Sequence, residues 1–259
     1  MSMGVSVIVI TKDEEAALGD ALRSVAWADE IIVVDSGSRD RTGQIARDSG
    51  ARVIVTGDWP GFGPQKNRAL DAATQDWVLS LDADERVTPE LREEIAALLA
   101  DGPKDAAYEM PRLSRYCGRF MRHSGWWPDY VTRLFRRGAA RFSDDLVHER
   151  LVVNGSTGRM KNHLVHHAFD DFEEVLRKVD QYSTANARML HERGRTGSLA
   201  KAIAHGCWAF LRTYVLRGGF LDGRHGFMLA VSNAEGTYYR YLKLMLLRDQ
   251  GIENADERG

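Results

Sequence analysis

Three carboxylates follow one apolar run of the sequence at very short spacing. In the stretch VLSLDADERV, residues 78–87, the apolar half gives way to Asp82, Asp84 and Glu85. Carboxylate oxygens are the ligands that Mg²⁺ and Mn²⁺ prefer, and these ions usually hold substrate phosphates as well. Zinc fits less well, because no paired His or Cys stands at a fixed local spacing. The alternative is a solvated turn with helix-capping acids, since Asp-rich turns are common.

Other polar side chains follow apolar runs in the same way. Thr11, Asp13 and Glu14 come after the run at residues 5–10, and Asp35 ends the run at residues 30–35. Thr11 followed by acids is typical of a helix N-terminus, so we predict that Thr11 caps a helix. The simplest alternative for Asp35 is that it closes a turn with the serines that follow it.

These clusters require a framework that brings them together. Buried strands and helical patterns alternate along the first half of the chain, with strands predicted at residues 5–10, 30–35, 52–56 and 77–82. Helices are predicted after Thr11, over residues 42–49 and 63–73, and from Thr88 onward, where Thr88 is an N-cap followed by Pro89. Such alternation predicts an α/β fold with a mostly parallel sheet flanked by helices. Because ligands bind beyond the carboxyl ends of such strands, the polar clusters are expected at one edge.

The pattern changes to long helices from Asp170. We predict a first domain over residues 1–169, a C-terminal helical extension over 170–248 and a flexible tail over 249–259. The extension carries many basic residues, namely Arg212, Arg217, Arg224, Arg240, Lys243 and Arg248. Basic amphipathic helices can lie in a membrane surface. The alternative is a helical subdomain that packs on the sheet, and both can hold together.

Composition excludes several classes of protein. The chain has 259 residues, 44% apolar residues and a net charge of −2, so it lacks the basic footprint of a nucleic-acid-binding protein. Its most apolar stretch, residues 199–216, contains Lys201, His205 and Arg212, which are costly at the centre of a membrane span. Two cysteines are too few for a disulfide framework, and the first residues lack the features of a secretory leader. We therefore expect a cytoplasmic protein.

Four stretches, in this order and spacing, resemble the amino-terminal half of family 2 glycosyltransferases of the GT-A fold. They are VSVIVITKDEE, EIIVVDSGSRDRT, GPQKNRAL and WVLSLDADER, and they lie within about the first ninety residues. Farther along, GWWPDYVTRLFRRG and DDLVHERL resemble a bacterial subgroup that adds a hexose, often glucose, to a heptose of the lipopolysaccharide inner core.

This resemblance implies a Rossmann-like GT-A fold and an inverting transfer of a hexose from a UDP-sugar to a lipid-linked saccharide. It also implies a Mg²⁺ or Mn²⁺ cofactor and a peripheral location on the inner face of the cytoplasmic membrane. One alternative is a polysaccharide or protein glycosyltransferase of the same family with another acceptor. Another is a peripheral membrane scaffold without catalysis, although Asp82 and Asp84 argue against it. Nucleotidyl transfer fits poorly, because TKDEEAALG is not a Gly-rich phosphate loop.

Carried over by motif, the resemblance gives the donor residues their roles. Thr11, Asp13 and Glu14 would line the nucleotide pocket, with Asp13 standing where the subgroup often has Asn. Asp35 would hold the uracil or ribose edge. Lys66 would lie near the uracil or the diphosphate, unless it belongs to a solvated helix face.

The remaining donor and metal residues follow from the same motifs. Asp82 would face the ribose or the donor sugar. Asp84 would bind the metal ion, with Asp82 as a second ligand and His148 as a further residue that approaches the ion. Arg133 and Arg136 are candidates for cationic support of the diphosphate. Their alternative is an alternating strand whose basic side faces solvent.

An inverting transfer needs a base on the acceptor hydroxyl, opposite the leaving diphosphate. Glu149 is our first candidate, because it follows RLFRR where relatives place an acidic pair. Asp129 is the second candidate, and Asp145 in the stretch FSDDLVHERL is a competitor. The alternative for Glu149 is an ion pair with Arg150 or Arg133.

Overall fold

The computed structural model describes residues 3–143 and 150–256, with side chains described up to residue 249. The chain forms two compact units. The first contains Met1–Leu113 and Asp129–His166, and the second contains Ser114–Pro128 and His167–Gly259. The sequence placed one boundary near residue 169, close to His166, but it did not predict that residues 114–128 join the helical unit.

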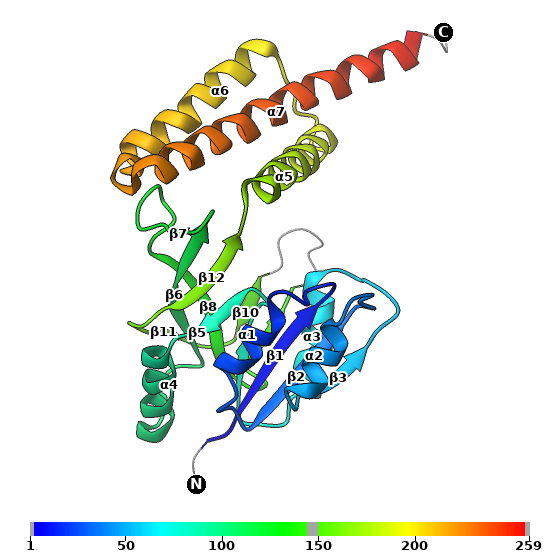
Figure 1. Cartoon of the computed structure of the whole chain (residues 1–259). Coiled ribbons are helices and arrows are strands. Elements are labelled where there is room, and N and C mark those ends of the chain that lie inside the picture. The colour runs from blue at the N-terminus through cyan, green and yellow to red at the C-terminus, as the bar shows by residue number, and fades with distance from the viewer. Residues whose placement is uncertain (1–2, 144–149, 257–259) are drawn as a thin grey trace. The chain divides into compact units, whose positions relative to one another are not determined.

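The first unit is built on the predicted strands. The parallel strands β1 (Val5–Thr11), β2 (Glu30–Asp35), β3 (Arg52–Val55) and β4 (Trp77–Ser80) lie in the order β3-β2-β1-β4. Figure 1 labels the first three of them side by side. β1, β2 and β4 are almost wholly buried, as expected of β-branched runs covered on both faces. Each predicted strand is confirmed to within two residues.

Four helices cover this part of the sheet: α1 (Leu18–Ser24), α2 (Thr42–Asp48), α3 (Phe62–Ala72) and α4 (Pro89–Asp101). Two apolar cores lie on the two faces. One contains Leu22 of α1 and Ile95 of α4, and the other contains Leu70 of α3. The predicted cap of α4 is confirmed, since the Thr88 hydroxyl accepts a hydrogen bond from the Leu91 amide at 3.2 Å.

The predicted helix cap at Thr11 is wrong. Thr11 is the last residue of β1, and α1 begins only at Leu18. The amide of Asp13 donates to the Ser38 hydroxyl at 2.9 Å, and the amide of Glu15 donates to Asp40 at 3.1 Å. These bonds hold the segment against the loop after β2, so the acids after Thr11 do not form a first helical turn.

The sheet continues in mixed directions beyond β4. β8 (Asp129–Arg136) is antiparallel to β4, and β6 (Ala107–Tyr116), β12 (Leu164–Phe169) and β5 (Glu85–Val87) follow in that order. β7 (Arg119–Phe120) and β11 (Thr157–Arg159) pair with β6, while β9 (Ala140–Phe142) and β10 (Leu151–Val153) form a separate sheet. The predicted α/β architecture is confirmed, and the parallel strands β3, β2, β1 and β4 are followed by strands of mixed direction.

The second unit is mainly helical. It contains α5 (Phe172–Glu192), α6 (Leu199–Leu211), the π-helical turn η1 (Arg212–Leu216), the 3-10 turn η2 (Gly219–Asp222) and α7 (Gly223–Asp256). Both α5 and α6 pack on α7, which continues into the region predicted as a flexible tail. The predicted helical extension is confirmed. Within the described part of the chain, no helix has the length and apolarity to cross a membrane.

Candidate active site

The carboxyl ends of β1 and β2 place Thr11 beside Asp35. The two residues are register partners, and each is only 4% exposed. The Thr11 hydroxyl oxygen is buried and has no hydrogen-bond partner among the described residues. A buried hydroxyl without a partner is costly, so this atom indicates a polar ligand at the edge of the sheet.

The loops after these two strands are joined by reciprocal hydrogen bonds. The Arg39 amide donates to the Asp13 carboxylate at 2.8 Å, in return for the bond from the Asp13 amide to Ser38. The Glu14 amide donates to the Thr42 hydroxyl at 2.7 Å. Asp13 has a φ of 54°, in the left-handed region that Asp and Asn tolerate better than most residues. The backbone there suits Asp and Asn alike.

Asp35 closes the turn after β2, as the simpler hypothesis predicted. Its Oδ1 accepts hydrogen bonds from the Ser38 amide at 2.9 Å and the Ser38 hydroxyl at 2.6 Å. Both bonds go to one oxygen, while Oδ2 faces Gly43, where an added Cβ would lie 3.2 Å away. A turn-closing role therefore leaves the second oxygen for a ligand, and the predicted nucleotide role of Asp35 stays a prediction.

Lys66 projects from α3 toward the carboxylates at the end of β4. It is 6% exposed, and its Nζ lies 3.0 Å from Asp82 Oδ1 and 5.5 Å from the centroid of the Phe142 ring. The alternative of a solvated helix face is therefore wrong for Lys66. Its neighbour Arg68 lies nearer the surface, where it pairs with Asp58 at 2.7 Å.

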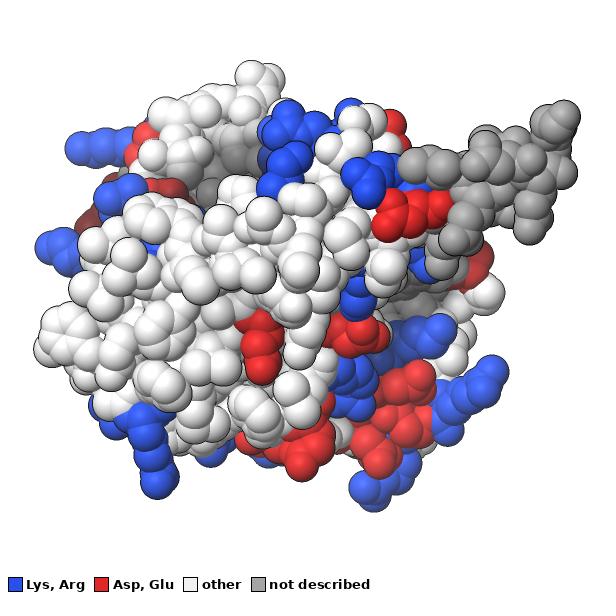
Figure 2. Space-filling view, turned by 90° about the horizontal axis from the view of Figure 1, so that it is seen from above, with Lys and Arg blue, Asp and Glu red and all other residues white. Residues whose placement is uncertain are grey.

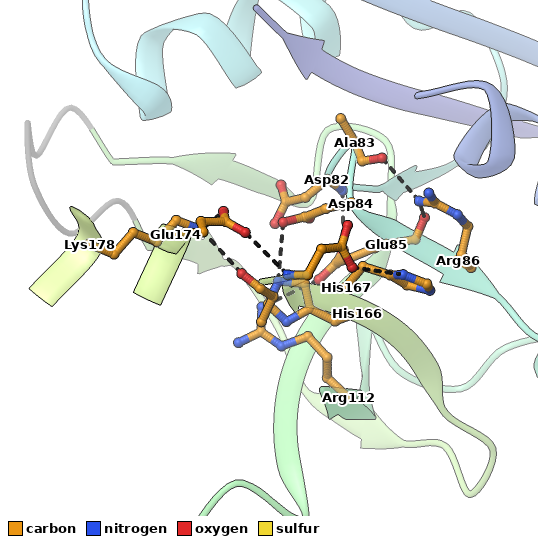
Figure 3. A network of polar contacts seen from close by, with 12 residues as sticks. Asp82, Ala83, Asp84, Glu85, Arg86, Arg112, His166, His167, Glu174 and Lys178 are labelled. Carbon is orange, nitrogen blue, oxygen red and sulfur yellow. Dashed lines mark hydrogen bonds and ion pairs between the residues drawn. The ribbon is translucent and has the colours of Figure 1, made fainter. Parts of the chain in front are cut away.

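Asp82 and Glu85 share one arginine of β8 (Figure 3 shows both carboxylates). Nη2 of Arg133 forms ion pairs with Asp82 Oδ2 and, at 2.6 Å, with Glu85 Oε1. Glu85 is fully buried, and its Oε2 accepts a hydrogen bond from the Asp82 amide at 3.1 Å. Arg133 is 7% exposed, so the alternative of a solvent-facing basic strand is wrong at this position.

Burial and pairing act in opposite directions on these charges. Burial raises the pKa of Asp82, but the charges of Arg133 and Lys66 outweigh it and hold the pKa well below its ordinary value. Burial likewise lowers the pKa of Arg133, but Asp82 and Glu85 outweigh it and raise the pKa. Asp82 and Arg133 therefore both stay ionised at neutral pH, in direct contact with each other.

Asp84 points to a different partner, a histidine of β12 (Figure 3). β5 pairs with β12 so that Glu85 lies opposite His166, and His166 Nε2 lies 3.3 Å from Asp84 Oδ2. A carboxylate and an imidazole at this separation are a plausible pair of metal ligands. Among the described residues, no group of three or more His, Cys, Asp and Glu side chains could hold an ion. Asp84 and His166 alone would supply two ligands of such a site.

Asp129 is attached to the same network through Arg112. The two residues are register partners of β8 and β6, and Asp129 Oδ2 accepts from Arg112 Nε at 3.0 Å and Nη2 at 2.6 Å. Arg112 Nη1 also lies 3.4 Å from Glu85 Oε1. Arg112 thus links Asp129, the second candidate for the base, to Glu85.

The structure does not bring all the predicted residues together. Arg136 is paired with Trp77 at the start of β4, whereas Asp82 follows the end of that strand, and Arg136 is exposed. Both oxygens of Asp82 are engaged by cations, which favours the predicted sugar-facing role over metal ligation. Asp145, His148 and Glu149 lie outside the described residues, so their roles stay predictions.

Three residues of the network were absent from the predicted site. Glu85 was visible beside Asp82 and Asp84, but its burial could not be seen from the spacing. Arg112 and His166 lie in strands whose partners are distant in sequence. The adjacent pair His166 and His167 was the only local signal in the sequence for a histidine in this network. Side chains alternate along a strand, so two neighbouring histidines place one imidazole on each face of the sheet.

Comparisons with known proteins agree with this arrangement. The family described as Glycosyl transferase family 2 matches residues 6–152. An uncharacterised glycosyltransferase of Rickettsia prowazekii is 31% identical over 97% of this chain and 89% of its own length. The lipopolysaccharide core biosynthesis glycosyltransferase LpsC of Rhizobium meliloti is 32% identical over 92% of this chain and 89% of its own.

Among solved structures, a glucosyl-3-phosphoglycerate synthase from Mycobacterium tuberculosis, in complex with Mn²⁺, UDP and glucosyl-3-phosphoglycerate, is 28% identical. The match covers 44% of each chain with a TM-score of 0.37. The family match and the two relatives cover the strands and loops that carry Thr11, Asp35 and Asp82. This chain therefore belongs to glycosyl transferase family 2.

Proposed function

We propose that this protein transfers a hexosyl group, glucose in the first instance, from a UDP-sugar to a lipid-linked saccharide, the heptose of a lipopolysaccharide inner core. The relative LpsC, which is 32% identical over most of both chains, supports this acceptor class. A different saccharide or protein acceptor is the second hypothesis, since members of one family can share a donor site and differ in acceptor.

One observation carries the proposal. The buried, unpartnered hydroxyl of Thr11 lies beside Asp35 at the carboxyl ends of β1 and β2. The ion pair of Lys66, from α3, with Asp82, after β4, belongs to the neighbouring elements. In open α/β sheets this edge binds ligands. A nucleoside offers polar atoms for Thr11 and Asp35, and a diphosphate offers negative charge for Lys66.

The residues beside Asp84 fit a divalent cation. Asp84 and His166 would hold the ion, and the diphosphate and water would complete its coordination, since Mg²⁺ and Mn²⁺ commonly bind through few protein ligands. When bound, the ion supplies positive charge beside the leaving diphosphate. His148, which the sequence also indicated, lies outside the described residues.

The chain's own groups divide the reaction between them. Lys66 and Arg133 are the cations at the end of β4, and they stabilise negative charge that grows on the diphosphate as its bond to the anomeric carbon breaks. The acceptor oxygen forms its bond from the opposite face, and its proton passes to a carboxylate. We assign that carboxylate to Glu149, with Asp129 and Asp145 as the alternatives.

The test uses purified protein with Mn²⁺, UDP-glucose and other UDP-hexoses, and lipopolysaccharide truncated after the core heptose. We expect release of UDP together with a mass increase of one hexose on the acceptor. Asp84→Ala serves as the inactive control, because Asp84 is partly exposed and contributes little to packing. Release of UDP without an acceptor product in any heptose-ended saccharide would reject the proposed acceptor while leaving the family assignment intact.

We further propose that the protein works at the cytoplasmic face of the inner membrane, where a lipid-linked acceptor would meet a soluble donor. Fractionation of cells that produce the full chain tests this location. Recovery of the protein only in the soluble fraction at low salt would contradict it.

A further inference from the structure

The second unit exposes large apolar side chains along one helical hairpin. Six of them, on α6, η1, η2 and the start of α7, form what we term the apolar face: Trp208, Leu211, Leu216, Phe220, Leu221 and Phe227. Each is between 44% and 63% exposed. Figure 2 shows a wide area with few charged side chains over α6, with charged side chains of both signs at its margins. Exposed apolar side chains that cluster in this way usually mark a binding surface.

α6 turns its small side chains inward and its large ones outward. Ala202, Gly206 and Ala209 are its buried residues, and Gly206 lies so close to α7 that an added Cβ would be 3.3 Å from Tyr238 Cβ. Trp208 and Leu211 lie on the other side and are exposed. An ordinary amphipathic helix would present polar residues there. The outward side of α6 therefore lacks the composition of a solvated face.

The end of the hairpin is held in place by close backbone packing. An added Cβ at Gly226 would lie 1.8 Å from the Gly219 carbonyl oxygen, so η2 and α7 touch through these two glycines. Asp222, 2% exposed, accepts hydrogen bonds from the amides of Arg122 at 3.2 Å and His123 at 2.9 Å. Leu216, Phe220 and Leu221 are thus presented by a fixed turn.

The exposed charges between residues 199 and 234 are all basic, and the next acid along α7, Glu235, is partly buried beside the apolar groove between α6 and α7. Between residues 199 and 234 the only acid is Asp222, which is buried and hydrogen-bonded, whereas Lys201, Arg212, Arg217 and Arg224 are basic and exposed. No ion pair engages these four cations among the described residues. A second copy of the same face would bring like charges together. An anionic lipid surface instead satisfies the cations and the apolar side chains at once.

We propose that the apolar face is a docking surface for an anionic lipid bilayer. Its apolar side chains enter the boundary between headgroups and acyl chains, and Lys201, Arg212, Arg217 and Arg224 bind the lipid phosphates. The proposal deepens the proposed function and rests on it for its purpose, which is to bring the donor site to a lipid-linked acceptor. Vesicle binding itself requires no catalysis, so the two can fail separately.

The test is sedimentation of the full-length protein with vesicles of phosphatidylcholine alone or mixed with phosphatidylglycerol. The mixed vesicles should bind the protein, and salt should weaken the binding. Changing Leu216, Phe220 and Leu221 to Ser should weaken partition by about a hundredfold, because each side chain contributes buried apolar area. Changing Lys201, Arg212 and Arg224 to Glu should do the same, because each cation contributes about a factor of five.

Two matched controls use the same unit. Leu176→Ser with Leu246→Ser removes apolar side chains of similar exposure, 48% and 53%, from α5 and from the C-terminal half of α7, outside the apolar face. Arg188, Arg193 and Arg195 changed to Glu reverse three exposed charges elsewhere. Both controls should retain wild-type binding. Lys243 is unsuitable for either test, because its Nζ lies 2.7 Å from Asp180.

Insertion can be observed directly through Trp208. Lipids brominated near the headgroup should quench its fluorescence, and Trp208→Phe should remove that quenching while the protein still sediments. The proposal is overturned if wild-type protein binds neutral and anionic vesicles equally, or if the Leu216, Phe220 and Leu221 variant binds normally. It is also overturned if the wild-type protein does not bind vesicles but forms a dimer that this variant abolishes. Vesicle binding without any hexosyl transfer would instead reject the proposed function alone.

Discussion

Replacing Arg133 with Met should destabilise the first unit strongly. Arg133 is 7% exposed and pairs with both Asp82 and Glu85, and Glu85 is fully buried. Removal of one partner from a buried ion pair costs about 3–5 kcal/mol, because the other charge is left without compensation. Arg112 remains 3.4 Å from Glu85, so we expect the lower end, about 3 kcal/mol. That is roughly two powers of ten in the unfolding equilibrium.

Hydrogen exchange of the β1 and β4 amides measures this loss within the first unit, since the slowest amides of a unit report its global opening. Adding Glu85→Gln to Arg133→Met should recover part of the stability, because it removes the stranded charge. Arg136→Met is the matched control on the same strand. Arg136 is exposed and contacts the Trp77 face, so its loss should cost less than about 1 kcal/mol. Equal protection in the two single variants would refute the argument.

Four further predictions concern the site. The lowered pKa of Asp82 stabilises the folded protein at pH values above 3.8, the ordinary value, and this stability is lost as the pH falls below it. Asp82→Asn should therefore reduce the dependence of the unfolding free energy on pH below pH 4 by about 1.4 kcal/mol per pH unit, measured by urea titrations. Thr11→Val should stabilise the ligand-free protein by about 1 kcal/mol yet weaken UDP binding in calorimetry, and unchanged UDP affinity would contradict the nucleotide role. His166→Ala should weaken Mn²⁺ binding to the UDP complex by at least about tenfold, whereas normal affinity would remove His166 from the ion and Asp84 would need another partner. Glu149→Gln should lower kcat by about 10²–10⁴-fold with donor affinity retained, and near-normal turnover would assign the base elsewhere.

The sequence predicted the parts of the fold that depend on local pattern. Short apolar runs predicted β1, β2 and β4, and the Thr-Pro pair predicted the start of α4, because burial and capping depend on adjacent residues. The edge that gathers Thr11, Asp35 and Asp82 followed from strand–helix alternation alone. The same local logic failed after Thr11, where hydrogen bonds from the loop after β2 replaced the expected helical turn.

The remainder of the site depends on strand pairing that no local pattern specifies. His166 reaches Asp84 because β12 pairs with β5, and Arg112 reaches Asp129 because β6 pairs with β8. These pairs are separated by many residues in the chain, and an antiparallel register cannot be read from either strand by itself. Glu85 was recognised as a carboxylate but not as a buried one, because its two arginines come from those later strands.

The reciprocal bonds between the loops after β1 and β2 affect how a nucleotide binds. Asp13 is already bonded to Ser38 and Arg39, and Glu14 to Thr42, without a ligand, in a backbone that includes one left-handed residue. Ordering a loop on binding costs conformational entropy and reduces the affinity that the contacts could provide. Here that entropy is lost during folding, so a nucleotide meets an assembled rim. Its binding should show a small entropy penalty and a fast association that does not wait for a loop to close.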